Sequence, residues 1–114
     1  MKYFITLFSI LAITIPAFSI TNQEITTRVI SDKAFVLEVE TAIKNRFRQP
    51  KMVKLRFASV QAAMGKSPYF YAKFRFDVQA GDIGYGLCSH TVLGVIQPNA
   101  SLLFQKIVHE DCGE

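Results

Sequence analysis

Residues 69–78 read Tyr-Phe-Tyr-Ala-Lys-Phe-Arg-Phe-Asp-Val, and the other predicted elements are arranged around this segment. From Phe70 onward, every second residue of this segment is apolar, and the residues between them are tyrosine or charged residues. Because successive side chains of a strand point to opposite faces, this period of two predicts a strand with one buried face. The face with Phe70 is expected to line the core and the face with Lys73 to meet water. Strands of this kind are typical of antiparallel sheets.

Three further strands are expected around this stretch. Residues 53–57 show the same alternation, with Lys54 and Arg56 on the polar side, and strands are predicted near 85–96 and 102–109. The turns between the four strands are predicted at Met64–Pro68, Ala80–Asp82 and Gln97–Ala100.

The chain before the strands has a helical period. Ser31 is a suitable N-cap, Asp32 suits the first turn, and Pro50 ends the pattern, so one helix is predicted at about 31–48. Residues 20–30 are predicted to be either a loose arm or a short first strand. The helix is recognised by apolar residues at every fourth position: Phe35, Val39, Ile43 and Phe47.

These elements predict a single α+β domain over residues 20–114. One helix lays its apolar stripe on the buried face of a four-stranded antiparallel meander sheet. About 95 residues suffice for one modest hydrophobic core, near the size at which a covalent crosslink helps.

Residues 1–19 have the three parts of a secretory signal peptide. Lys2 precedes an uncharged apolar run that ends at Pro16, and small residues follow at signal-peptidase spacing. Cleavage is predicted after Ser19, with Ala17 as the second choice. The alternatives are an uncleaved membrane anchor and a buried helix. The predicted location is secreted or periplasmic, with no stable membrane span once the signal is removed.

The chain has two cysteines, Cys88 and Cys112. In an exported protein two cysteines predict one disulfide, whereas two buried free thiols are the alternative. If the last two strands pair across the turn at Pro98, residue 88 lies opposite about residue 109, which leaves Cys112 three residues further along.

Motifs for catalysis or for cofactor binding are not found in the sequence. The two histidines, His90 and His109, lack metal-ligand spacing, and Ser89 and His90 are strand neighbours that point to opposite faces. We therefore predict a protein without enzymatic activity, cofactor or metal.

Charge is distributed unevenly along the chain. The stretch from Lys44 to Arg75 contains nine basic residues and no acidic one. Four of them are expected on the outward face of two paired strands, beside two tyrosines, where they would meet an anionic partner. Export argues against nucleic acid, and an ordinary solvated sheet face is the alternative. The four basic residues are Lys54, Arg56, Lys73 and Arg75.

The predicted fold resembles that of the cystatins. The segment Gln61-Ala62-Ala63-Met64-Gly65 is similar to the Q-x-V-x-G motif of their first hairpin loop, and Tyr69–Lys73 resembles the strand that follows it. Pro98 and Asn99 fall where the family has Pro-Trp in its last hairpin loop. The Cys88–Cys112 pair matches the C-terminal bridge of secreted cystatins.

Two functions are expected. The preferred one is an exported, non-enzymatic binding or accessory domain that uses the basic sheet face to bind a protein or an anionic surface. The resemblance implies the other, which is inhibition of papain-like cysteine proteases by a wedge of the loops at 61–65 and 97–100.

Overall fold

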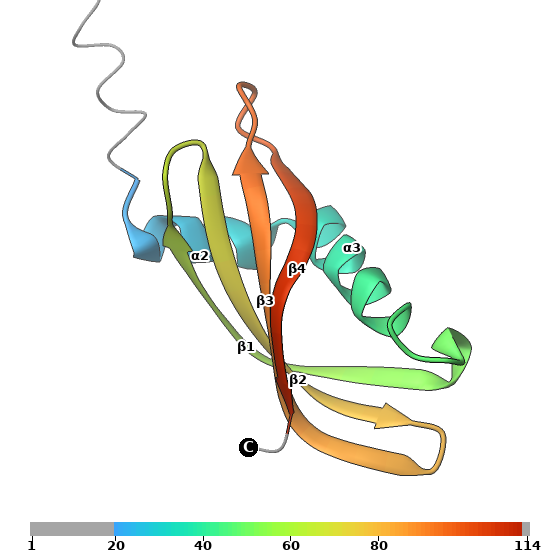
Figure 1. The fold of residues 1–114 in the computed structure, drawn as a ribbon. Coiled ribbons are helices and arrows are strands. Elements are labelled where there is room, and N and C mark those ends of the chain that lie inside the picture. Colours follow the sequence, from blue (N-terminus) through green and yellow to red (C-terminus); the bar gives the residue numbers. More distant parts are fainter. Residues whose placement is uncertain (1–19, 113–114) are drawn as a thin grey trace, which may run out of the picture.

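The computed structural model describes residues 20–112 as two helices packed on one face of a four-stranded antiparallel sheet (Figure 1). The predicted signal peptide lies outside the described residues. The elements follow the chain as α2 (Asn22–Ser31), α3 (Lys33–Lys44), the 3₁₀ turn η2 (Pro50–Met52), β1 (Val53–Met64), β2 (Tyr69–Ala80), β3 (Ile83–Ile96) and β4 (Leu102–Cys112). The strands lie in the order β1-β2-β3-β4, which confirms the predicted meander.

The expectation of an arm or a strand over residues 20–30 is wrong, because this segment forms α2. Thr21 caps its first turn: the Thr21 hydroxyl accepts from the Glu24 N–H at 3.1 Å, and the Glu24 carboxylate accepts from the Thr21 N–H at 2.9 Å. Ile25 and Val29, one turn apart, are fully buried against the sheet. Their burial stabilises a helix whose many β-branched residues disfavour it locally.

The second helix is shorter than the predicted 31–48. Ser31 is the last residue of α2 rather than an N-cap. The extended backbone angles of Asp32 end α2 and separate it from α3. Its carboxylate accepts from the Phe35 N–H at 3.0 Å and so caps α3. The helix ends at Lys44, and Phe47 lies beyond it, with its ring 5.5 Å from that of Tyr85.

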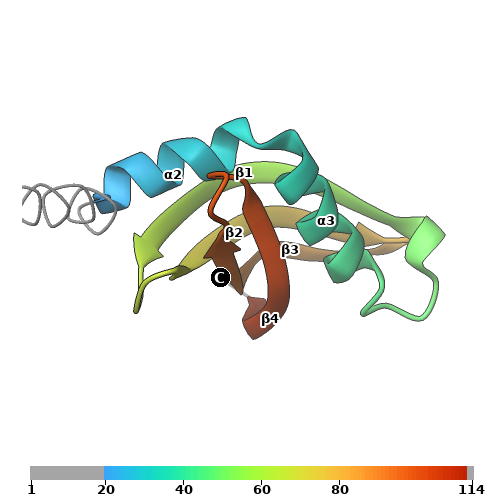
Figure 2. The ribbon, with the colours of Figure 1, turned by 90° about the horizontal axis from the view of Figure 1, so that it is seen from above.

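The core lies between the helices and the inner face of the sheet (Figure 2). Three of the four residues of the predicted apolar stripe lie in α3 and are fully buried, as is the apolar face of β2, whereas Phe47 is only partly buried. Phe35 is central, with its ring 5.6 Å from that of Phe70 and 6.4 Å from that of Phe74.

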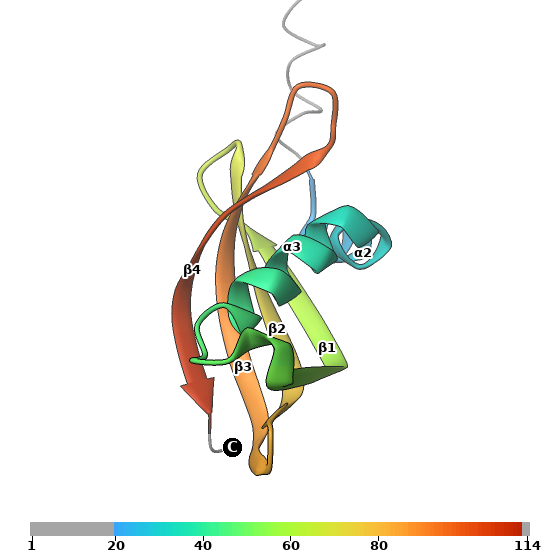
Figure 3. The same cartoon turned by 90° about the vertical axis from the view of Figure 1, so that its right-hand side faces the viewer.

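The sheet bends around α3, and the strand register shows where (Figure 3). Ala58 is an extra residue in β1, between the pairs Phe57–Phe76 and Ser59–Arg75. Tyr85 is an extra residue in β3, beside Gly86, whose φ is 76°. β-Bulges of this kind increase the local twist and bend a strand.

Strand β4 contains two more bulges, at Gln105 and Val108. Each adds one residue to β4 relative to β3, so Cys112 lies directly opposite Cys88. The predicted disulfide is present, with 4.1 Å between the two Cα atoms. The expected offset of three residues is thus absorbed by the two bulges and a slightly wider loop.

Candidate binding surface

The helices leave one face of the sheet uncovered, and we call it the outer face (Figure 2). The register places all four predicted basic residues on it. Lys54 and Arg56 lie opposite Gln79 and Asp77 of β2, while Lys73 and Arg75 lie on the same side of β2 itself, opposite Gln61 and Ser59 of β1.

The outer face carries more positive than negative charge, although the acid-free stretch of sequence overstates the excess. Asp77 lies directly opposite Arg56. Asp111 of β4 lies opposite Ser89 of β3, which in turn lies opposite Arg75 of β2. Lys106 of β4, which sequence reasoning missed, also lies on this face, because it is paired with Leu93 of β3, which is paired with Tyr71 of β2. Five cations and two carboxylates therefore share the outer face by register.

Two aromatic side chains lie among these charges. Tyr69 and Tyr71 are 44% and 45% exposed, with their neighbours across the sheet being Val95 and Leu93 of β3. An exposed tyrosine offers an apolar ring and a polar hydroxyl to a ligand at a small cost in conformational entropy.

The edge strand β1 is covered along its second half by α2. The Thr26 hydroxyl accepts from the Ala62 N–H at 2.8 Å, and the Asn22 side-chain oxygen accepts from the Met64 N–H at 3.0 Å. These backbone groups point away from β2 and would otherwise be open to another strand.

A groove of about 820 Å³ runs between this part of α2 and the outer face. It brings together Gln61, Ala62 and Ala63 of the predicted first loop with Lys73 of the predicted basic face. Tyr71 also lines it. The sequence could not reveal this groove, because its helical wall was not predicted.

The first hairpin loop is shorter than predicted from the cystatin-like segment 61–65. Gln61, Ala62, Ala63 and Met64 all belong to β1, so the expectation that they form a loop is wrong, and only Gly65 of the segment lies in the turn. The Gly65 N–H donates to the Tyr69 carbonyl at 3.0 Å, closing a tight connection over residues 65–68.

Pro98 and Asn99 do lie in the connection between β3 and β4. This loop and the 65–68 turn are at the same end of the sheet, and the Ile96 N–H donates to the Pro68 carbonyl at 2.9 Å (Figure 1). A pocket of about 590 Å³ lies between them, lined mostly by apolar residues that include Ile20, Met64 and Leu103.

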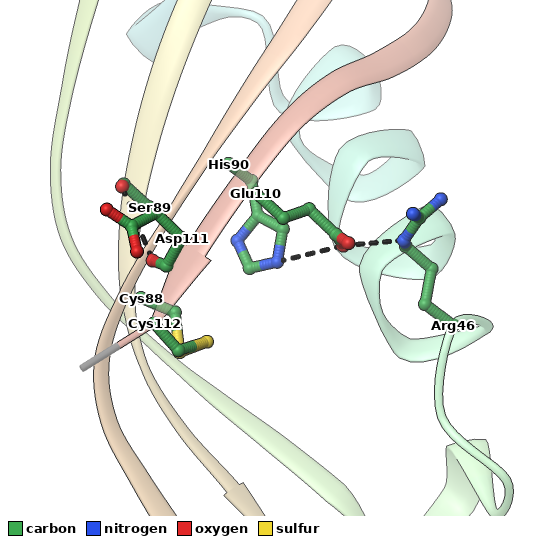
Figure 4. The surroundings of a disulfide bond; sticks show 7 residues. All are labelled: Arg46, Cys88, Ser89, His90, Glu110, Asp111 and Cys112. Carbon is green, nitrogen blue, oxygen red and sulfur yellow. Dashed lines mark hydrogen bonds and ion pairs between the residues drawn. A yellow bond between two sulfur atoms is a disulfide. The ribbon is translucent and has the colours of Figure 1, made fainter.

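The disulfide lies next to a buried histidine on the inner face (Figure 4). His90 is 3% exposed, and its Nε2 atom is 3.4 Å from Glu110 Oε2, which also pairs with Arg46 Nε at 2.5 Å. The Nδ1 atom of His90 has no hydrogen-bond partner among the described residues. Burial lowers the pKa of His90, an effect that Glu110 opposes and Arg46 reinforces.

This cluster does not form a catalytic pair with Ser89. The Ser89 hydroxyl points to the outer side, 3.5 Å from the Asp111 carbonyl, while His90 lies on the inner side (Figure 4). Residues 20–112 contain no group of three or more histidine, cysteine or acidic residues able to hold a metal ion. In the same range no helix is long and apolar enough to cross a membrane.

Comparisons with protein-family models, with curated proteins and with solved structures find no match to this chain.

Proposed function

We propose that this chain is an exported, non-enzymatic binding domain that takes an anionic partner on the outer face of its sheet. The observation that carries the proposal is the set of five cations and two carboxylates on a face that neither α2 nor α3 covers. Single exposed charges contribute little, but several on one face attract an anionic partner over a Debye length of about 8 Å at physiological salt.

The test is a binding titration with three anionic probes: a tetraglutamate peptide, vesicles rich in phosphatidylglycerol, and an acidic polysaccharide. The double variant Lys54→Glu/Lys73→Glu reverses two charges of the outer face. Lys33→Glu/Lys51→Glu makes the same change in charge at exposed positions outside this face. We expect the first variant to lose at least about tenfold in affinity at low salt, and the second to lose much less.

Two results would reject this proposal. One is that none of the three probes binds, and the other is that both double variants weaken binding equally, which would mean that net charge alone is responsible.

Export is part of the proposal, and the disulfide supports it because such bonds persist mainly in oxidising compartments. Mass spectrometry of the protein recovered from the secreted or periplasmic fraction should give an N-terminus at Ile20. Recovery only from the cytosol, with Met1 retained, would contradict it.

One observation favours the second candidate, protease inhibition. The 65–68 turn, the loop containing Pro98 and Asn99, and Ile20 meet at one end of the molecule around an apolar pocket. Such a wedge is what the resemblance to cystatins implies. Two glycines inserted between Lys66 and Ser67 should weaken inhibition of a papain-like protease, and the same insertion between Gly81 and Asp82, at the opposite end, should not. Absence of inhibition by the unmodified protein at micromolar concentration would exclude this function.

A further inference from the structure

The groove between α2 and the outer face has the chemistry of a sugar site. It is lined by twelve residues, of which eight carry a neutral amide or hydroxyl side chain. Its volume of about 820 Å³ falls within the range of about 300–1,000 Å³ that is typical of ligand sites. We propose that this groove binds an acidic oligosaccharide, an inference that rests on the proposed function and names its ligand class.

Several polar side chains of the groove have unused hydrogen-bonding capacity. Within residues 20–112 the side chains of Gln23, Ser59 and Gln61 make no hydrogen bond, in contrast to Thr26 and Asn22, which hold the edge of β1. An amide presents two donors and an acceptor, and a hydroxyl presents both kinds of group. Neighbouring hydroxyls of a sugar ring, each a donor and an acceptor, match this set.

Tyr71 supplies the surface on which a sugar ring can stack. Its ring is 45% exposed, and it lies against the backbone of Gly65, where an added Cβ atom would be only 3.0 Å from Tyr71 Cε2. The absence of a side chain at Gly65 thus allows the ring to rest on the hairpin. The C–H groups of a sugar ring pack on such an aromatic face, while its hydroxyls turn to the amides beside it.

The charge of the groove selects an acidic ligand. Among the described residues that line it, Lys73 is the only one with a charged side chain, and none of them has a carboxylate. It lies between Gln61 of β1 and Thr91 of β3, so a ligand that touches Gln61 meets the ammonium group as well.

An acidic peptide would fit this place less well. An extended peptide usually gains affinity by adding a strand to an open sheet edge. Here the N–H groups of Ala62 and Met64 are already bonded to side chains of α2, so this part of the edge offers a peptide no backbone pairing. A sugar chain needs only the side chains.

The experiment measures binding of three probes to the oxidised protein by calorimetry: tetragalacturonate, neutral maltotetraose and tetraglutamate. We expect tetragalacturonate to bind tightest. Gln61→Ala should lower the affinity for tetragalacturonate about fivefold, because a hydrogen bond is lost. Tyr71→Ser should lower it about tenfold, because the stacking surface is lost. Neither variant should change the affinity for tetraglutamate. Lys73→Gln should weaken both acidic probes.

Matched controls lie outside the groove. Gln105→Ala removes an exposed amide of β4, and Tyr85→Ser removes a tyrosine that is 40% exposed near the turn between β2 and β3. Both should leave tetragalacturonate binding within about twofold of the unmodified protein.

These measurements distinguish failure of the sugar-site proposal from failure of the proposed function. If both acidic probes bind equally and respond only to Lys73→Gln, the sugar site is rejected while the anionic binding function stands. If maltotetraose binds as tightly as tetragalacturonate, selection for an acidic sugar is rejected. If none of the three probes binds and the vesicles and polysaccharide also fail, both proposals are overturned.

Discussion

The hydroxyl of Thr26 takes the place of a neighbouring strand beside Ala62. It accepts from the Ala62 N–H at 2.8 Å and lies 3.1 Å from the Ala62 carbonyl oxygen, so one side chain meets both backbone groups of this edge residue. Its proton is shared between that carbonyl and the carbonyl of Asn22, at 2.8 Å.

The Thr26→Val substitution tests this contact, because it keeps the shape of the side chain and removes its hydrogen bonds. A partly buried N–H would be left without a partner, so unfolding in urea should show a loss of about 1–2 kcal/mol. Thr27→Val is the control, since the Thr27 hydroxyl donates to the Gln23 carbonyl on an exposed turn of α2, and this substitution should cost less than about 0.5 kcal/mol. Equal losses would show that the Thr26 contact contributes nothing specific.

Gly94 is required by the core. A Cβ atom there would lie 2.4 Å from Phe70 Cζ, and the Phe70 ring is fully buried in the core. Gly94→Ala should therefore destabilise the protein by at least about 2 kcal/mol through overpacking. Gly84→Ala, in the same strand, places its Cβ atom in open space and should change stability by less than about 0.5 kcal/mol. Thermal unfolding of both variants tests this prediction. A Gly94→Ala variant as stable as the unmodified protein would contradict it.

The stability of the protein should depend on pH through His90. Burial lowers the pKa of His90 in the folded state, whereas the unfolded chain takes up a proton near pH 6.5. The folded state is therefore favoured above that pH and loses stability as the pH falls from 6.5 through the lower, folded pKa. Denaturant unfolding between pH 7 and pH 5 should show this loss, and His90→Gln should reduce its slope. The same slope in the unmodified protein and in His90→Gln would contradict this prediction.

The Cys88–Cys112 bridge closes a loop with a sequence separation of 24 residues. Constraining such a loop in the unfolded chain stabilises the folded state by about 3.5 kcal/mol in the chain-entropy model. Reduction should therefore lower the urea midpoint, and the double variant Cys88→Ala/Cys112→Ala should show the same decrease without reductant. Adding reductant to that variant provides the control, because it has no bond to break.

The strands could be predicted from the sequence because their buried faces repeat every second residue, which is clearest in β2. Helix α2 could not, since Thr26, Thr27 and Ile30 all disfavour a helix, and burial of Ile25 and Val29 overrides that preference. One local signal was present: Thr21 and Glu24 have the spacing of a capping box.

The candidate surface could be predicted only in part. Alternation placed Lys73 and Arg75 on the correct side of β2, because no bulge interrupts that strand between them. Lys106 was missed, since the extra residue Gln105 shifts the alternation of β4. The groove depends on contacts between α2 and β1 that are 36 or more residues apart in the chain, for which no local pattern exists.

The two bulges of β4 determine where this strand can change in length. Each extra residue exchanges the inner and outer positions that follow it, and the second exchange cancels the first, so Leu102 and Cys112 both face inward. Deletion of Gln105 or of Val108 would remove one bulge and leave every later residue with its present partner and on its present side, so Cys112 would still lie opposite Cys88. These two extra residues are therefore the positions at which β4 can lose length without losing the disulfide.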